Sequence, residues 1–191
     1  MVERKLEPGQ KFHRYVWHDR KAWWQQEQGI LAYLILNGIL GDDEYLKHAR
    51  ESAAFYNAWF LDHDDGAVYF NVLANGLPYL LGNERFKGSH SMSAYHSTEL
   101  CYLSAVYQNL LITNQPLDLY FKPYPDGFKR NILRVSPDIL PPGSVKIEKV
   151  WINDQEHTDF AADELTVKLP RSSERLKVKV RLAPQPRAAR A

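Results

Sequence analysis

Apolar residues in the N-terminal half of the chain recur at the three- and four-residue spacing of helices. The pattern predicts a first helix over residues 20–36, whose apolar positions are too broadly spread for one narrow stripe, so that we expect burial on more than one side. An acidic N-cap signal at Asp42 follows a glycine and predicts the start of a second helix, paired with the first as a helical hairpin. A third helix is predicted over 93–112, and residues 67–72 predict a short extended piece.

Beyond residue 117 the apolar residues alternate with polar ones or form short runs between Pro and Gly. The strand-like run 145–152 alternates strictly over its first part, and 176–182 alternates throughout, which predicts strands with one solvated face. Asn153-Asp154 is typical of a hairpin turn. A small antiparallel sheet or sandwich is therefore predicted, with further strands at 117–121, 132–135 and 164–169.

The expected fold class is α+β. An all-α helical-hairpin segment over residues 1–115 is followed by a small antiparallel β module over 116–184 and a flexible tail over 185–191. The 191 residues are 45% hydrophobic and 25% charged, a composition that excludes disordered, collagen-like and coiled-coil classes.

Charge and cysteine usage narrow the range of partners. The formal net charge of +1 gives no reason to expect nucleic acid. No apolar run approaches the roughly 20 residues that span a bilayer, so no membrane partner is expected. Cys101 is the single cysteine, which excludes an internal disulfide and a cysteine-based zinc cluster. The charged N-terminus lacks the apolar core of a secretion signal, and we expect a cytoplasmic protein.

The signatures of several common enzymes are absent: the Gly-rich phosphate loop, the Gly-x-Ser-x-Gly elbow and His-Glu-x-x-His. What remains at the predicted start of the first helix is Trp23-Trp24, followed by Gln26, Glu27 and Gln28. An indole plane could stack on a sugar ring while the amides or the carboxylate bond its hydroxyls one helical turn later. The alternative is that both indoles belong to the core, as large aromatic residues near helix starts usually do.

Tyr95-His96 lies at the start of the third predicted helix, after a run of small residues. An imidazole there could exchange a proton with a ligand near neutral pH, which makes His96 a candidate catalytic residue. The alternative is a surface or capping histidine. Asp62, Asp64 and Asp65 flank a Gly-containing turn and should serve that turn, so we expect neither a metal nor a cofactor.

Taken in order, these features resemble the N-acylglucosamine 2-epimerase superfamily, which includes the cellobiose 2-epimerases. The family shows Lys-x-Trp-Trp-x-Gln, then an acidic stretch with Gly and an aromatic residue, then a Lys-Gly segment that leads to Tyr-His. Here the matching positions are residues 21–26, 62–69, Lys87-Gly88 and Tyr95-His96. The resemblance covers roughly residues 18–112.

This resemblance implies part of an (α/α)6 barrel, an open-chain sugar as substrate, and two histidines that move a proton at C2 through an enediolate. It makes His96 the later catalytic histidine and places Trp23 and Trp24 near the sugar. Two positions depart from the family: Gln28 stands where a Glu is usual, and Glu99 where an Arg is common. The earlier catalytic histidine has no counterpart in this sequence.

We therefore expect a carbohydrate 2-epimerase or aldose–ketose isomerase-like protein that supplies only part of the barrel. Its catalytic residue would be His96, within about 15 Å of the indoles, and its substrate-binding residues Trp23, Trp24, Gln26, Glu27 and Tyr95. Apolar residues left without a neighbour, Trp23, Leu31, Tyr56 and Leu103 among them, should form an exposed patch that leads to self-association or recruits a partner chain. The competing hypothesis is a non-catalytic carbohydrate-binding or interaction fragment.

Overall fold

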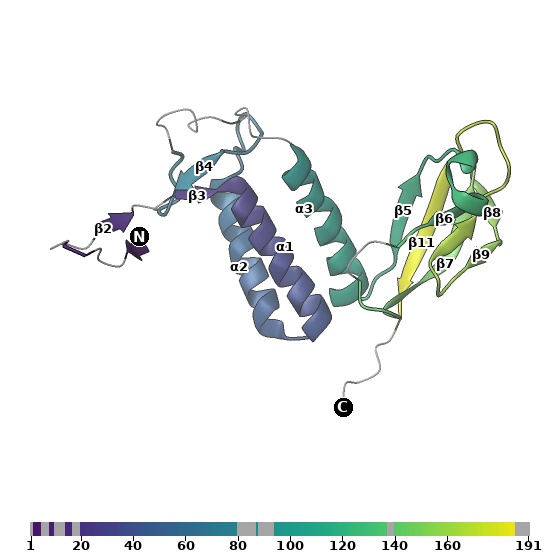
Figure 1. Cartoon of the computed structure of the whole chain (residues 1–191), viewed down its shortest axis with the longest axis horizontal. Coiled ribbons are helices and arrows are strands. Elements are labelled where there is room, and N and C mark those ends of the chain that lie inside the picture. Colours follow the sequence, from purple (N-terminus) through teal and green to yellow (C-terminus); the bar gives the residue numbers. More distant parts are fainter. Residues whose placement is uncertain are drawn as a thin grey trace. The chain divides into compact units, whose positions relative to one another are not determined.

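The computed structural model describes residues 2–4, 8–9, 14–16, 20–79, 87, 94–136 and 140–185. Contacts within the chain divide it into two compact units, whose elements are labelled in Figure 1. Unit 1 comprises residues 1–33 and 43–101, and unit 2 comprises residues 34–42 and 102–191. The expected domain boundary near residue 115 stays a prediction.

Three helices carry the N-terminal half: α1 (Trp23–Leu40), α2 (Asp43–Trp59) and α3 (Ala94–Tyr107), the last continued by a π-helical turn, Gln108–Ile112. Asp43 and Glu44 lie in the first turn of α2, where carboxylates interact favourably with the helix dipole. In unit 1 the Gln26 side chain donates to the backbone oxygen of Ser52 at 3.3 Å, and the Tyr33 ring lies 5.4 Å from the His48 ring. The first part of α1 therefore lies antiparallel beside α2 (Figure 1).

The buried side chains of α1 share one face. At about 100° per residue, they fall within roughly a third of the helix circumference, and they are Trp23, Glu27, Ile30, Leu31, Leu34 and Asn37. The expectation of burial on more than one side is wrong for these residues, because the flanking positions are only half-buried and Trp24 is 40% exposed. One carboxylate, that of Glu27, lies in the middle of the buried face.

Residues 20–22, expected to begin the first helix, instead form a strand, β3 (Arg20–Ala22), antiparallel to β4 (Asn71–Leu73). The backbone N–H of Trp23 extends this pairing to the Phe70 oxygen at 3.1 Å. The pairing satisfies a backbone donor that the first turn of a helix leaves without an intrahelical partner. β4 partly confirms the extended piece expected over 67–72. A second unexpected pair is β1 (Val2–Arg4) with β2 (Arg14–Val16).

Unit 2 contains two antiparallel sheets (Figure 1). The larger has the order β5 (Leu117–Phe121), β11 (Val178–Pro184), β7 (Val145–Ile152) and β8 (Gln155–His157). The smaller has the order β6 (Ile132–Arg134), β10 (Thr166–Lys168) and β9 (Phe160–Ala161), with two 3-10 turns, Pro125–Gly127 and Lys129–Asn131, before β6. All five predicted strands are present, and the predicted turn at Asn153-Asp154 has both residues at positive φ, 50° and 67°.

The inward positions of both sheets meet in one apolar core, to which Val106 and Leu110 of the third helical segment also belong. Val150, Val167 and Val180, one from each of three strands, are completely buried. Every second residue of β11 faces this core. On β7 two consecutive exposed residues, Glu148 and Lys149, interrupt the alternation, and the register with β11 shifts there. Two sheets over a common core are the arrangement expected of a sandwich.

Two glycines allow close approach of aromatic rings. A Cβ atom at Gly38 would lie 3.0 Å from the Tyr107 ring and 2.9 Å from Leu111, so the end of α1 contacts the end of α3 only without a side chain there. Gly76 has a φ of 91°, and a Cβ atom would lie 2.4 Å from the Trp59 ring.

The protein is thus α+β, with three helices and antiparallel sheets in its described residues. None of the helices in that part of the chain is both long and apolar enough to cross a membrane. One expectation needs correction: Trp23, Leu31 and Tyr56 are only 3%, 3% and 5% exposed, so they do not form an outer apolar patch.

Asp118 on β5 offers a test of the outer face of the sandwich. Its carboxylate accepts two hydrogen bonds from Arg181, at 2.7 and 2.9 Å, and pairs with Lys179 at 2.9 Å. The Arg181 guanidinium, and then Lys179, lower the pKa of Asp118 from 3.8 to about 2. A lowered pKa stabilises the fold above the unfolded value, and this contribution is lost as the pH falls from about 4 toward 2.

We expect Asp118→Asn to lower the unfolding free energy by about 1 kcal/mol at neutral pH, as partly exposed ion pairs do. The difference from the unmodified protein should shrink as the pH is lowered through that window. Urea unfolding followed by circular dichroism at several pH values measures it. Asp126→Asn, at an exposed carboxylate in a 3-10 turn, is the control. A difference that is constant with pH would contradict the role given to this carboxylate.

Candidate functional site

Glu27 is a fully buried carboxylate on α1 that bonds both other helices of unit 1. Its Oε1 accepts hydrogen bonds from the Tyr56 hydroxyl on α2 at 2.5 Å and from the Ser97 hydroxyl on α3 at 2.7 Å. A buried carboxylate without donors is strongly unfavourable, and these two bonds satisfy Oε1. Oε2 is also buried and has no hydrogen-bond partner among the described residues. Burial, and then the bond to Glu27, raise the pKa of Tyr56, and its hydroxyl therefore stays a donor at neutral pH.

We call the bonds of Glu27 to Tyr56 and Ser97 the Glu27 junction. A hollow of about 480 Å³ lies beside it, and its lining consists of Trp23, Trp24, Gln28, Phe70 and His96. The His96 ring stacks on Trp24 with centroids 6.1 Å apart and lies edge-on to Trp23 at 6.3 Å. Phe70 lies 4.6 Å from Trp23 and closes another side. The expectation that His96 lies near both indoles is confirmed. Trp23 is buried, as the core interpretation expects, and it also lines the hollow, while Trp24 is 40% exposed. Sugar stacking on the two indoles stays a prediction.

Three of the residues expected to bind substrate do not line the hollow. Gln26 turns toward α2, where it bonds Ser52. The Glu27 carboxylate is enclosed by Tyr56 and Ser97. Tyr95 is 64% exposed and contacts the His96 ring edge-on at 5.0 Å. Gln28 and Phe70 take their places in the lining.

The Nδ1 side of the His96 ring is occupied by polar side chains. The Gln28 amide donates to Glu99 Oε2 at 2.8 Å and lies 3.3 Å from Nδ1, and Glu99 Oε2 lies 3.8 Å from the same nitrogen. Gln28 and Glu99 are the two positions at which the sequence departs from the epimerase pattern. The structure brings these two side chains into direct contact, although they are distant in the sequence. The sequence alone did not reveal this contact.

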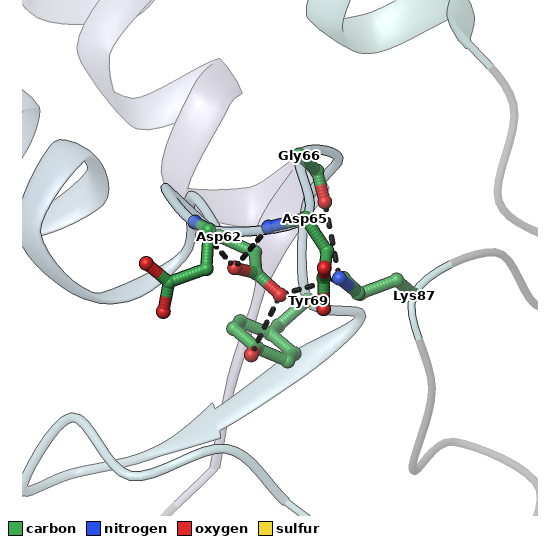
Figure 2. A network of polar contacts seen from close by, with 6 residues as sticks. Asp62, Asp65, Gly66, Tyr69 and Lys87 are labelled. Carbon is green, nitrogen blue, oxygen red and sulfur yellow. Dashed lines mark hydrogen bonds and ion pairs between the residues drawn. The ribbon is translucent and has the colours of Figure 1, made fainter.

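Lys87, from the Lys-Gly segment, is bonded to the acidic turn after α2 (Figure 2). Its ammonium group pairs with Asp62 Oδ2 and donates to the Gly66 oxygen at 3.1 Å, and the Tyr69 hydroxyl donates to Asp62 at 3.1 Å. Two segments that the resemblance had matched separately therefore meet. Gly88, the other residue of the Lys-Gly pair, lies outside the described residues.

Asp62 also organises the turn itself, since its Oδ1 accepts the backbone N–H groups of Asp64 and Asp65 at 3.0 and 3.1 Å (Figure 2). This confirms the expected role in the turn for Asp62, whereas Asp64 and Asp65 contribute through their backbone N–H groups. The Lys87 ammonium, followed by these backbone donors, holds the pKa of Asp62 well below its usual range. Asp62 in turn raises the pKa of Lys87. Within the residues that the structure describes, no group of three or more His, Cys, Asp or Glu side chains is placed to hold a metal ion.

Comparison with known proteins gives partial likenesses only. No protein-family model and no curated protein matches the chain. Among solved structures, the cellobiose 2-epimerase from Spirochaeta thermophila DSM 6192 aligns with 46% of this chain at 24% identity and a TM-score of 0.43. A sugar epimerase from a ruminal bacterium aligns with 46% at 17% identity and a TM-score of 0.41. The matched parts span 21% and 22% of those chains, about a fifth of their length.

The Glu27 junction predicts that removing a single hydroxyl group lowers the stability of the protein markedly. Tyr56→Phe removes one of the two donors to a buried carboxylate and should lower the unfolding free energy by about 2 kcal/mol. Because the pKa of Tyr56 is raised, its contribution should persist below about pH 10, the usual pKa of a tyrosine, and decline at more alkaline pH. Tyr33→Phe, which alters a half-buried ring on α1, is the matched control. Equal urea midpoints for the two variants would contradict the junction.

The Gln28–Glu99 contact predicts a compensating pair of substitutions. Gln28→Glu alone places two carboxylates next to each other and should destabilise the protein by about 1 kcal/mol. Combining it with Glu99→Arg replaces the hydrogen bond with an ion pair and should recover that loss. A thermodynamic double-mutant cycle from urea unfolding measures the coupling. Additive effects of the two substitutions would show that the side chains do not interact.

Proposed function

We propose that the hollow binds a sugar and that His96 exchanges a proton with its C2 carbon, as in a carbohydrate 2-epimerase or aldose–ketose isomerase. The observation that carries this proposal is the stacking of the His96 ring beside Trp24 in a hollow that Trp23 and Phe70 close with apolar surface. A sugar ring has faces of C–H groups that suit an indole plane, and edges of hydroxyls that suit the Gln28 amide.

The arrangement around His96 favours a role for Nε2. Gln28 and Glu99 lie on the Nδ1 side, so Nε2 is the nitrogen left to meet a ligand. The Gln28 amide nitrogen can only donate, so its contact with Nδ1 places the proton of the neutral ring on Nε2. For Nε2 to act as the base that removes the C2 proton, the Gln28 amide has to turn away, so that Nδ1 carries the proton and faces Glu99. The Glu99 carboxylate, 3.8 Å from Nδ1, then stabilises the positive charge of the doubly protonated ring.

Inversion at C2 needs a second acid/base group on the opposite face of the carbon. Among the described residues, the lining of the hollow contains one histidine and no carboxylate. In the proposal, the second group and the enclosing wall come from further helices of an (α/α)6-type barrel, supplied by a longer protein, a partner chain or self-association. In the aldose–ketose reaction the proton moves between C2 and C1 on one face of the sugar. This reaction therefore needs fewer acid/base groups around the hollow than inversion at C2 does.

A non-catalytic carbohydrate-binding role is the second candidate. It is favoured by the same lining, because the one titratable side chain there has no acid/base partner within it. In that case the indoles and Gln28 bind the sugar, and His96 serves as a further aromatic and polar contact.

The test combines binding and proton exchange. The full chain is incubated with mannose, N-acetylmannosamine or cellobiose in deuterated water, while NMR follows the indole N–H groups and the C2 proton. We expect a sugar to shift the Trp24 signal, and we expect Trp24→Ala to abolish binding. Trp59→Phe, at an indole outside the hollow, should bind like the unmodified chain. C2 exchange should be about 10²–10⁴ slower than an enzyme-like rate, because one acid/base group is missing, and still faster than in His96→Ala. Exchange no faster than in His96→Ala would favour the non-catalytic binding role.

Two results would overturn parts of this account. Binding that survives Trp24→Ala would remove the hollow as the sugar site. Exchange at an enzyme-like rate that disappears in His96→Ala would establish the role of His96 but show that the chain needs no second part.

A further inference from the structure

The outer face of the larger sheet in unit 2 carries an aromatic and cationic row. Strand register places Tyr120 of β5, Lys179 of β11 and Trp151 of β7 side by side across three strands. The Lys179 ammonium lies 5.8 Å from the Tyr120 ring and 4.8 Å from the Trp151 ring, between the two aromatic side chains. Tyr120 is 72% exposed, which is unusual for a large aromatic residue on a well-packed sheet.

This row belongs to a groove of about 320 Å³, at the lower end of the roughly 300–1,000 Å³ typical of small-molecule sites. The residues that give the groove its chemistry are Tyr120, Lys122, Trp151, Asp154, Lys177 and Lys179. The exposed ammonium groups of Lys122 and Lys177 have no ion-pair partner within the described part of the chain. Lys179 is already paired with Asp118. The groove therefore combines apolar surface with two uncommitted positive charges.

We propose that this groove binds an acidic sugar, a pyranose ring that carries one carboxylate. The Tyr120 and Trp151 rings would contact the C–H faces of the sugar, and Lys122 and Lys177 would pair with its carboxylate. Asp154 decides between this ligand and a polyphosphate or nucleic acid strand. The Asp154 carboxylate can accept hydrogen bonds from sugar hydroxyls, and its repulsion grows with the number of negative charges on the ligand, so it disfavours a chain of phosphates more than a sugar with one carboxylate.

This site is separate from the hollow at His96, and its residues all belong to unit 2. The inference does not depend on the proposed function. A failure of one leaves the other in place, since Trp151 and Trp24 report on them independently.

The experiment is an NMR titration of the isotopically labelled full chain with sodium glucuronate at constant ionic strength. We expect saturable shifts at Tyr120 and at the Trp151 indole N–H, with a dissociation constant of about 1 mM, as fits a ligand of this size. Tyr120→Ser should weaken binding about tenfold, the effect of one aromatic contact. Lys122→Gln combined with Lys177→Gln should weaken it similarly and remove its dependence on salt.

Tyr124→Ser is the matched control, because Tyr124 is half exposed and contacts Arg175 at 4.2 Å but does not line the groove. It should bind glucuronate like the unmodified chain. Glucose, which lacks the carboxylate, should bind at least several-fold more weakly than glucuronate. The proposal is overturned by the absence of saturable shifts at these residues, by equal binding of glucose and glucuronate, or by tighter binding of an oligothymidylate than of glucuronate.

Discussion

The buried carboxylate of Glu27 is the interaction on which unit 1 depends. It lies in the middle of the buried face of α1 and receives hydroxyl donors from α2 and α3, so three helices that are separate in the sequence share one acceptor. Apolar contacts alone would allow these helices to slide or rotate with little penalty, since the hydrophobic effect has no direction. Hydrogen bonds to a buried charge do have direction, and leaving either donor unpaired would be unfavourable. The junction therefore fixes the register of the helices.

That register positions the hollow. Ser97 bonds Glu27 and is the neighbour of His96, while Trp23 and Trp24 lie one helical turn before Glu27 on α1. Holding Ser97 against α1 thus holds the imidazole against the indoles. Gln28 follows Glu27 directly and, together with Glu99, occupies the Nδ1 side of the ring. The Glu27 carboxylate and its two donors thus position four of the residues around His96, namely Trp23, Trp24, Gln28 and Glu99.

The sequence predicted the elements whose signals are local. β7 has the predicted bounds because its apolar residues fall on one buried face on either side of an irregularity at Glu148-Lys149, and α2 begins within one residue of the predicted acidic cap. The sequence-based prediction failed where pairing between distant segments decides the secondary structure. Arg20–Ala22 is a strand only because β4 lies beside it. In the site, the nearness of His96 to the Trp pair was predicted from the ordered motif. The burial of Glu27 was missed, because three adjacent polar residues on a helix do not show which one faces the core, and its partners Tyr56 and Ser97 are distant in the sequence.

The most direct test of the account is a crystal structure of the chain soaked with mannose. The account predicts the sugar against the Trp24 indole, with its C2 carbon about 3–3.5 Å from His96 Nε2, the separation at which proton transfer is geometrically feasible. It also predicts that Glu27 stays buried and bonded to Tyr56 and Ser97. A sugar bound elsewhere, or a Glu27 side chain turned to solvent while the hollow keeps its shape, would contradict it.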